Sequence, residues 1–176
     1  MKMHMPAIAA ALTVSMAGQA VAHITLAQTE AAAGSTYKGV LQVGHGCEGA
    51  PTTSVRIQIP DGVIAVKPMP KAGWQLKTKI EPYDNPVQHF DQTLTEGVRE
   101  IAWTGGSLPD EWYDEFVFRA TLPNAEPGSV IRFPVVQDCG QKVIRWIEVP
   151  AEGQDAHELP EPAPALTITP PASHHH

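Results

Sequence analysis

Short runs of alternating apolar and polar residues, separated by turns rich in proline and glycine, constrain this chain most strongly. In one run Val55, Ile57 and Ile59 alternate with Arg56 and Gln58. A period of two places successive side chains on opposite faces of a β-strand. The candidate strands are 36–45, 53–60, 63–68, 74–80, 98–106, 114–123, 129–139 and 142–150. Runs of this length and spacing favour an antiparallel sandwich over a parallel α/β sheet.

The connections between these runs carry residues that reverse a chain. They include PDG at 60–62, PKAG at 70–73, TGGSLPDE at 104–111 and NAEPGS at 124–129. Proline, glycine, asparagine and aspartate each favour turn conformations. No stretch of twelve residues keeps a helical apolar period, and seventeen prolines are difficult to place in helices. The sequence therefore predicts an all-β fold with short or no helix.

The first 22 residues have the layout of a secretory signal peptide. Lys2 precedes an apolar stretch at 7–17, and small residues end in Ala20-Val21-Ala22. A basic start, a short apolar middle and an A-x-A site are typical of such leaders. We expect export to the periplasm or the cell exterior, with cleavage after Ala22. The small-residue rule also permits cleavage after Ala20.

Removal of this leader leaves 154 residues, enough for one domain with a proper core. We expect that domain to span 23–152. From 153 to 176 the composition shifts to alanine, proline and acidic residues, which predicts a weakly ordered tail. Within it, the segment ALTITP at 165–170 would at most add an edge strand. The three final histidines are either native metal-scavenging residues or the remnant of a purification tag.

The net charge restricts the partners. The chain has 12 basic and 19 acidic residues, and loss of Lys2 with the leader brings the formal net charge from −7 to −8. An acidic chain is a poor match for nucleic acid or an anionic membrane. A cation or a neutral partner fits this composition better.

Two cysteines, Cys47 and Cys139, both lie in the part expected to be exported. In an oxidising compartment two such cysteines most often pair. The disulfide would close a loop of roughly 90 residues and contribute about 4 kcal/mol in the chain-entropy model. Neither cysteine belongs to a C-x-x-C unit, so a metal site through these thiols is not favoured.

His23 directly follows the expected cleavage bond. After cleavage it would carry a free α-amine beside its imidazole, and the amine nitrogen and ring Nδ1 would chelate one ion together. The amine has a reference pKa of about 7.7–8.0, so a divalent metal displaces its proton readily. Nitrogen donors in a tetragonal arrangement suit Cu(II). The alternatives are that His23 stands there by chance, or that cleavage after Ala20 removes the chelate.

Several segments resemble the YcnI-like family of exported bacterial copper-binding proteins. The stretches GHGCEGAPT at 44–52 and LPDEWYDEF at 108–116 are the most specific, and the resemblance extends from His23 to about Pro150. The similar segments are 23–63, 73–78, 101–106, 108–123 and 138–150. The resemblance implies an immunoglobulin- or fibronectin-like β-sandwich. It also implies one Cu(II) held by a monohistidine brace, made of an N-terminal histidine, a carboxylate and a nearby tryptophan.

Carried over to this chain, the brace implies His23, Glu48 and Trp146 as the metal-site residues. Glu48 is the acidic residue within the GHGCEGAPT segment, although it also suits a solvated loop. Trp146 shares one strand face with Ile144 and Glu148. Because the opposite face, with Val143, Ile147 and Val149, is more apolar, Trp146 is expected to shield a metal at the sandwich edge. Trp74, Trp103 and Trp112 are expected to be packing residues.

Two further histidines have an open role. His45 lies three residues before Glu48 and would reach the same site as an additional nitrogen ligand, or it is an exposed loop residue. His89 has the same ambiguity with weaker support. A disulfide between Cys47 and Cys139 would clamp the loop of Glu48 to the strand leading into Trp146, and so support the site without joining it.

Three functions compete. The first is a Cu(II)-binding chaperone, buffer or sensor, not an enzyme, that exchanges copper with other exported copper-handling proteins or a membrane copper transporter. The second is a copper-dependent oxidase or monooxygenase, which would need a second imidazole from His45 or His89. The third is a metal-free structural sandwich.

No G-x-S-x-G, phosphate-binding glycine loop or H-E-x-x-H supports a hydrolase or a nucleotide site. The oligomeric state is left open.

Overall fold

Strands dominate the part of the chain that the structure describes, residues 23–171 of a computed structural model. The expected signal peptide, its cleavage bond and the terminal histidines lie outside the described residues. The elements are β1 (Thr25–Leu26), β2 (Glu30–Ala32), β3 (Thr36–Val43), β4 (Thr52–Gln58), β5 (Ile64–Pro68), β6 (Gln75–His89), β7 (Gln92–Leu108), β8 (Asp114–Thr121), β9 (Val130–Arg132), β10 (Val135–Asp138), β11 (Val143–Trp146), η1 (Ala156–Glu158) and β12 (Ala165–Thr169).

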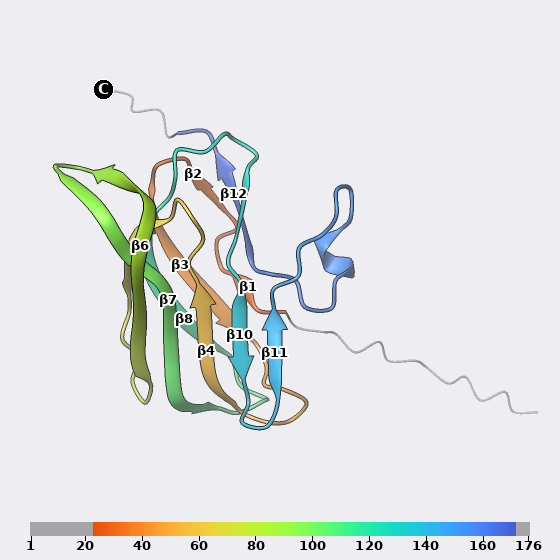
Figure 1. Ribbon diagram of the computed structural model, residues 1–176. Coiled ribbons are helices and arrows are strands. Elements are labelled where there is room, and N and C mark those ends of the chain that lie inside the picture. The colour runs from red at the N-terminus through yellow and green to blue at the C-terminus, as the bar shows by residue number, and fades with distance from the viewer. Residues whose placement is uncertain (1–22, 172–176) are drawn as a thin grey trace, which may run out of the picture.

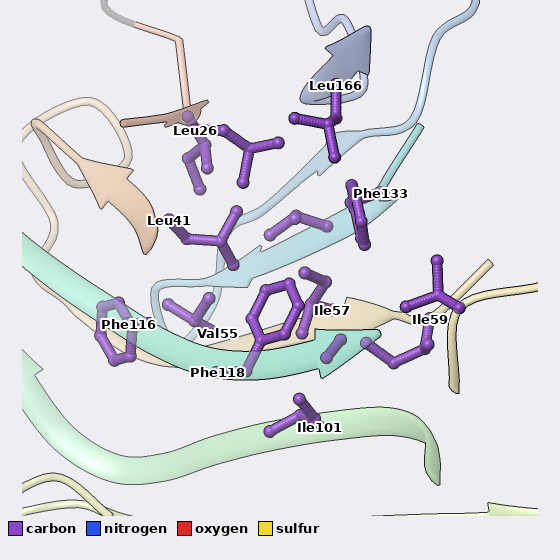
Figure 2. Packing of buried hydrophobic residues seen from close by; sticks show 14 of the residues in the cluster. Leu26, Leu41, Val55, Ile57, Ile59, Ile101, Phe116, Phe118, Phe133 and Leu166 are labelled. Atoms are coloured by element: carbon purple, nitrogen blue, oxygen red, sulfur yellow. The ribbon is translucent and has the colours of Figure 1, made fainter. Parts of the chain in front are cut away.

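Two antiparallel sheets form the sandwich (Figure 1). One has the strand order β1-β3-β8-β5, and the other has the order β11-β10-β4-β7-β6. The apolar positions of the alternating runs meet between the sheets, where Figure 2 shows Leu41, Val55, Ile57, Ile101 and Phe116 gathered in one cluster. Each of these five side chains has a relative exposure of 0%. The predicted all-β, immunoglobulin-like sandwich is confirmed.

Helix is limited to a single turn in the described residues. The 3-10 turn η1 begins after Asp155, whose carboxylate accepts a hydrogen bond from the backbone N–H of His157. This is the usual way in which an aspartate satisfies an exposed N–H at a helix start. No helix between residues 23 and 171 has the length and apolar content to cross a membrane.

The β6–β7 hairpin is much longer than its sequence pattern predicts. The predicted strands covered 74–80 and 98–106, whereas β6 and β7 continue to a turn between His89 and Gln92. The additional residues are mostly exposed or half-buried on both faces, and the register shifts between Lys79 and Ile80. Backbone pairing maintains these strands with little burial, so no apolar alternation marks them in the sequence. The hairpin extends away from the sandwich (Figure 1).

A third sheet corrects the prediction of a weakly ordered tail from residue 153. Its order is β2-β12-β9, so the ALTIT segment is a central strand, parallel to β2 and antiparallel to β9. Leu166 and Ile168 of β12 are 0% and 1% exposed and belong to the main core. These two alternating apolar residues provide enough burial to order the segment, even though proline and alanine dominate around it. The folded domain therefore extends through Thr169.

Substitution of Leu166 by alanine tests this extension. We expect Leu166→Ala to lower the free energy of unfolding by about 2–5 kcal/mol, because it removes fully buried methyl groups and leaves a cavity. Urea unfolding of the oxidised protein measures this change. Val130→Ala on the neighbouring strand β9 is the control, since Val130 is 48% exposed. Equal effects of the two substitutions would contradict the assignment of β12 to the core.

Candidate functional site

The candidate site lies where the described chain begins. His23 precedes β1, and its ring packs against the indole of Trp146 with centroids 5.7 Å apart and planes at 62°. Its neighbours fix this position, because Ile24 and Leu26 are 3% and 4% exposed in the core. The pairing of β1 with β3 adds backbone hydrogen bonds directly after the histidine. His23 is therefore held at the end of the sandwich by the burial of the residues that follow it.

His45 approaches the same indole from the β3–β4 loop. Its ring centroid is 6.1 Å from that of Trp146, with the planes at 71°. Nδ1 of His45 lies 2.5 Å from the carbonyl oxygen of Gly46. A carbonyl oxygen only accepts hydrogen bonds, so Nδ1 is the donor in this contact. The structure thus brings two of the predicted histidines to one tryptophan.

Two contacts hold the loop that carries His45. The predicted disulfide between Cys47 and Cys139 is confirmed, and the two cysteines are 92 positions apart in sequence. The backbone N–H of Gly46 donates to the carboxylate of Asp110 at 2.8 Å. Because the disulfide ties this loop to the end of β10, it fixes the loop next to the strand pair that ends in Trp146.

Gln137 is the site-supporting residue that the sequence analysis missed. It is 0% exposed on β10, and its Oε1 accepts from the indole Nε1–H of Trp146 at 3.0 Å. Its amide nitrogen donates to the carbonyl of His45 at 2.8 Å and to Oγ1 of Thr52 at 2.7 Å. The available signal was its inward position, between the apolar positions Val135 and Cys139 of one strand face.

Trp146 is a core residue on the edge strand β11, whereas the sequence pattern placed it at the sandwich edge without requiring its burial. It is 1% exposed and belongs to the apolar cluster. The opposite face of its strand, with Val143, Ile147 and Val149, is 45–63% exposed. The more apolar face is exposed because the side that carries Trp146 is the one that packs into the core between the sheets. Trp146 nevertheless reaches both histidines.

Glu48 stands apart from the two histidines in its contacts. Its side chain is 84% exposed and forms an ion pair with Lys142 at 2.6 Å. The hydrogen bond and the charge of Lys142 lower the pKa of the Glu48 carboxyl. Within residues 23–171 no three His, Cys, Asp or Glu side chains are grouped closely enough to hold a metal by themselves.

A pocket of about 290 Å³ adjoins His23 and is also lined by Glu30, His157 and residues of β12. Burial lowers the pKa of the His23 imidazole, and the positive charges of His157 and His45 lower it further. A lowered pKa keeps the imidazole neutral, which is the form that binds a metal. His157 was not among the predicted residues, because it lies in the segment expected to be disordered.

The remaining sequence candidates lie elsewhere. His89 ends β6 and packs on Phe90, with ring centroids 4.6 Å apart, at the tip of the long hairpin. That tip and η1 lie on opposite sides of the molecule (Figure 1). Trp74 and Trp103 pack on Phe116, as expected of packing residues.

Trp112 does not follow the expectation of a packing residue. Its side chain is 60% exposed, so it contributes little to the core. It follows Pro109 in the turn between β7 and β8, where the backbone N–H of Trp112 donates to the Pro109 carbonyl at 3.1 Å.

The fold and the site define an immunoglobulin-like β-sandwich whose first residues pack a histidine on a buried tryptophan. The chain belongs to the family described as a domain of unknown function, DUF1775, whose model matches residues 23–168. This family includes the YcnI-like proteins that the sequence resembles. The match begins at His23 and covers β12 almost to its end, in agreement with the domain limits of the structure.

Comparison with one solved structure supports the fold. An uncharacterized protein from Nocardia farcinica, whose crystal structure has an immunoglobulin-like fold, is 25% identical with a TM-score of 0.62. The alignment covers 84% of this chain and 98% of that one. A chain described as a membrane-anchored protein from Corynebacterium diphtheriae is 13% identical with a TM-score of 0.38, covering 85% of this chain and 34% of that one. No curated protein matches the chain.

Replacement of Gln137 tests its role in holding the site together. Gln137→Leu would leave the Trp146 indole N–H, the His45 carbonyl and the Thr52 hydroxyl without their present partner. We expect a loss of about 2–3 kcal/mol in unfolding free energy, since unsatisfied buried polar groups are costly. Urea unfolding measures it. Gln58→Leu is the matched control, because its amide bonds to Glu100 on the surface. A loss no larger than that of the control would refute the role.

Proposed function

We propose that this protein, exported and cleaved after Ala22, binds one Cu(II) through His23 and His45 beside Trp146. The observation that carries the proposal is the packing of both imidazoles on one indole, at 5.7 and 6.1 Å. Imidazole nitrogens suit Cu(II), and the new α-amine of His23 would add a third nitrogen. The disulfide supports an oxidising, periplasmic or extracellular location.

In this proposal His45 takes precedence over Glu48 as the second protein ligand. The carboxylate of Glu48 is exposed and paired with Lys142, whereas His45 is held by the Gln137 hydrogen bond and the disulfide loop. A ligand that is already positioned costs less ordering on binding. Trp146 would shield one side of the ion from water. The proposed role is that of a copper chaperone, buffer or sensor, with an exported copper protein or a membrane copper transporter as the exchange partner.

Titration with Cu(II) tests the proposal on protein that begins at His23. We expect one equivalent to bind tightly, and His23→Ala to weaken binding by about two orders of magnitude because the chelate is lost. Addition of one alanine before His23 should have a similar effect, since it displaces the α-amine. Isothermal titration against a competing chelator measures the affinities. His89→Ala is the control, and unchanged affinity of His23→Ala would overturn the proposal.

A second set of variants identifies the second ligand. We expect His45→Ala to weaken Cu(II) binding about tenfold or more. Glu48→Gln should leave the affinity within about threefold, because the carboxylate is engaged by Lys142. The same titration measures both. A large loss in Glu48→Gln together with no loss in His45→Ala would instead favour the carboxylate as ligand.

The pair of imidazoles also supports a second candidate, a copper-dependent oxidase or monooxygenase. Such a site needs two imidazoles and an amine around one copper ion, and His23 and His45 with the α-amine would meet that requirement. Copper-loaded protein incubated with ascorbate tests it by peroxide release or by oxidised products from polysaccharides. Product formation that disappears in His23→Ala would establish catalysis. Its absence would favour the binding role.

A further inference from the structure

Three cations form a row across the outer face of the first sheet. In the strand register, Lys38 of β3 lies opposite Arg119 of β8, and Lys67 of β5 lies opposite Arg119 on its other side. Directly opposed residues have their Cβ atoms about 4.5–5.5 Å apart. All three side chains are exposed. Positive charge is therefore concentrated within roughly two strand spacings, on a chain whose net charge is −7.

An acidic group lies near one end of this row, since Glu96 of β7 lines a second pocket with Lys67, but no ion pair among the described residues joins the row to an acid. Within residues 23–171 no carboxylate lies within ion-pair distance of Lys38, Lys67 or Arg119, whereas four other cations have such partners. The outward-facing acid of β8, Glu115, is four residues from Arg119, about 13 Å along the strand, and it accepts from the Tyr113 hydroxyl. Like charges directly opposite one another destabilise a sheet. An arrangement of this kind favours an anionic ligand that covers it.

An apolar groove continues from the row. The pocket of about 470 Å³ is lined by the three cations together with Met69, Val117 and neighbouring prolines. Met69 is 52% exposed, yet its backbone is fixed by a hydrogen bond to the Val117 carbonyl at 2.8 Å and by one from the Trp103 indole at 3.0 Å. The groove is thus held in place without a ligand. It combines a cationic end and an apolar floor in one site.

We propose that this groove binds a single anionic amphiphile, with its phosphate or carboxylate headgroup on the Lys38–Arg119–Lys67 row and its apolar chain along Met69. Charge complementarity favours the headgroup, and the apolar lining favours the chain. A monomeric amphiphile fits better than a membrane surface. Outside the groove the chain has more acidic than basic residues, and an anionic lipid surface would repel them. The site shares no residue with the histidine site, and it does not depend on the proposed copper function.

Octyl phosphate, used below its micelle concentration, is the probe. We expect isothermal titration to show one molecule bound per chain. Arg119→Gln should weaken binding about tenfold, since it removes the central charge-assisted contact. Inorganic phosphate lacks the apolar chain, and neutral octyl glucoside lacks the anionic headgroup. Each should bind at least about tenfold more weakly than octyl phosphate. Lys77→Gln, an equal change of charge at an exposed residue of the other sheet, should bind like the unmodified protein.

Thermal unfolding without ligand separates a binding defect from a folding defect. Arg119→Gln should unfold at the same temperature as the unmodified protein or at a higher one, because it relieves the repulsion along the row. Equal binding of octyl phosphate by Arg119→Gln, or equal binding of inorganic phosphate and octyl phosphate, would overturn the proposal. So would binding only to phosphatidylglycerol vesicles, or only to an acidic peptide.

Discussion

The buried amide of Gln137 is the interaction on which the candidate site depends. A fully buried amide is costly unless its donors and acceptor are all satisfied. Here one amide joins the indole of Trp146, the backbone of His45 and the hydroxyl of Thr52. These groups come from three separate stretches of chain. The orientation of the indole and the position of the β3–β4 loop are therefore coupled through a single side chain.

The disulfide adds a covalent constraint beside this hydrogen-bond network. Cys139 follows Gln137 by two residues at the end of β10, and Cys47 follows His45 by two residues in the loop. The same loop and strand are thus joined twice, once by the amide of Gln137 and once by sulfur. Closure of a loop of this length lowers the entropy of the denatured state and contributes about 4 kcal/mol of stability in the chain-entropy model. The network can therefore hold a loop rich in glycine, which would otherwise have many conformations.

The sequence predicted those parts of the fold in which burial and alternation coincide. Val55 and Ile57 face the core as their period of two required. The extension of the β6–β7 hairpin was missed because backbone pairing alone supports it. The central position of β12, which was expected to be at most an edge strand, was missed because its two apolar residues stand among prolines. The full burial of Trp146 did not follow from the sequence, since the apolar pattern of one short strand does not reveal which of its faces packs into the core. The disulfide was predicted correctly, and the sequence had singled out the two histidines, His23 and His45, that the structure brings to Trp146. His157 was not predicted, because its segment was expected to be weakly ordered.

The position of β12 has a consequence for the order in which the domain is completed. Pro164, Ala165 and Thr167 line the pocket beside His23, so residues at the start of the described domain contact residues of its last strand. A chain exported from its N-terminus would present His23 to the new compartment early, yet its surroundings would close only after the final strand had crossed. The histidine that emerges first would thus be among the last residues to reach its native environment. The site around His23 would then be completed at the same time as the chain leaves the export machinery.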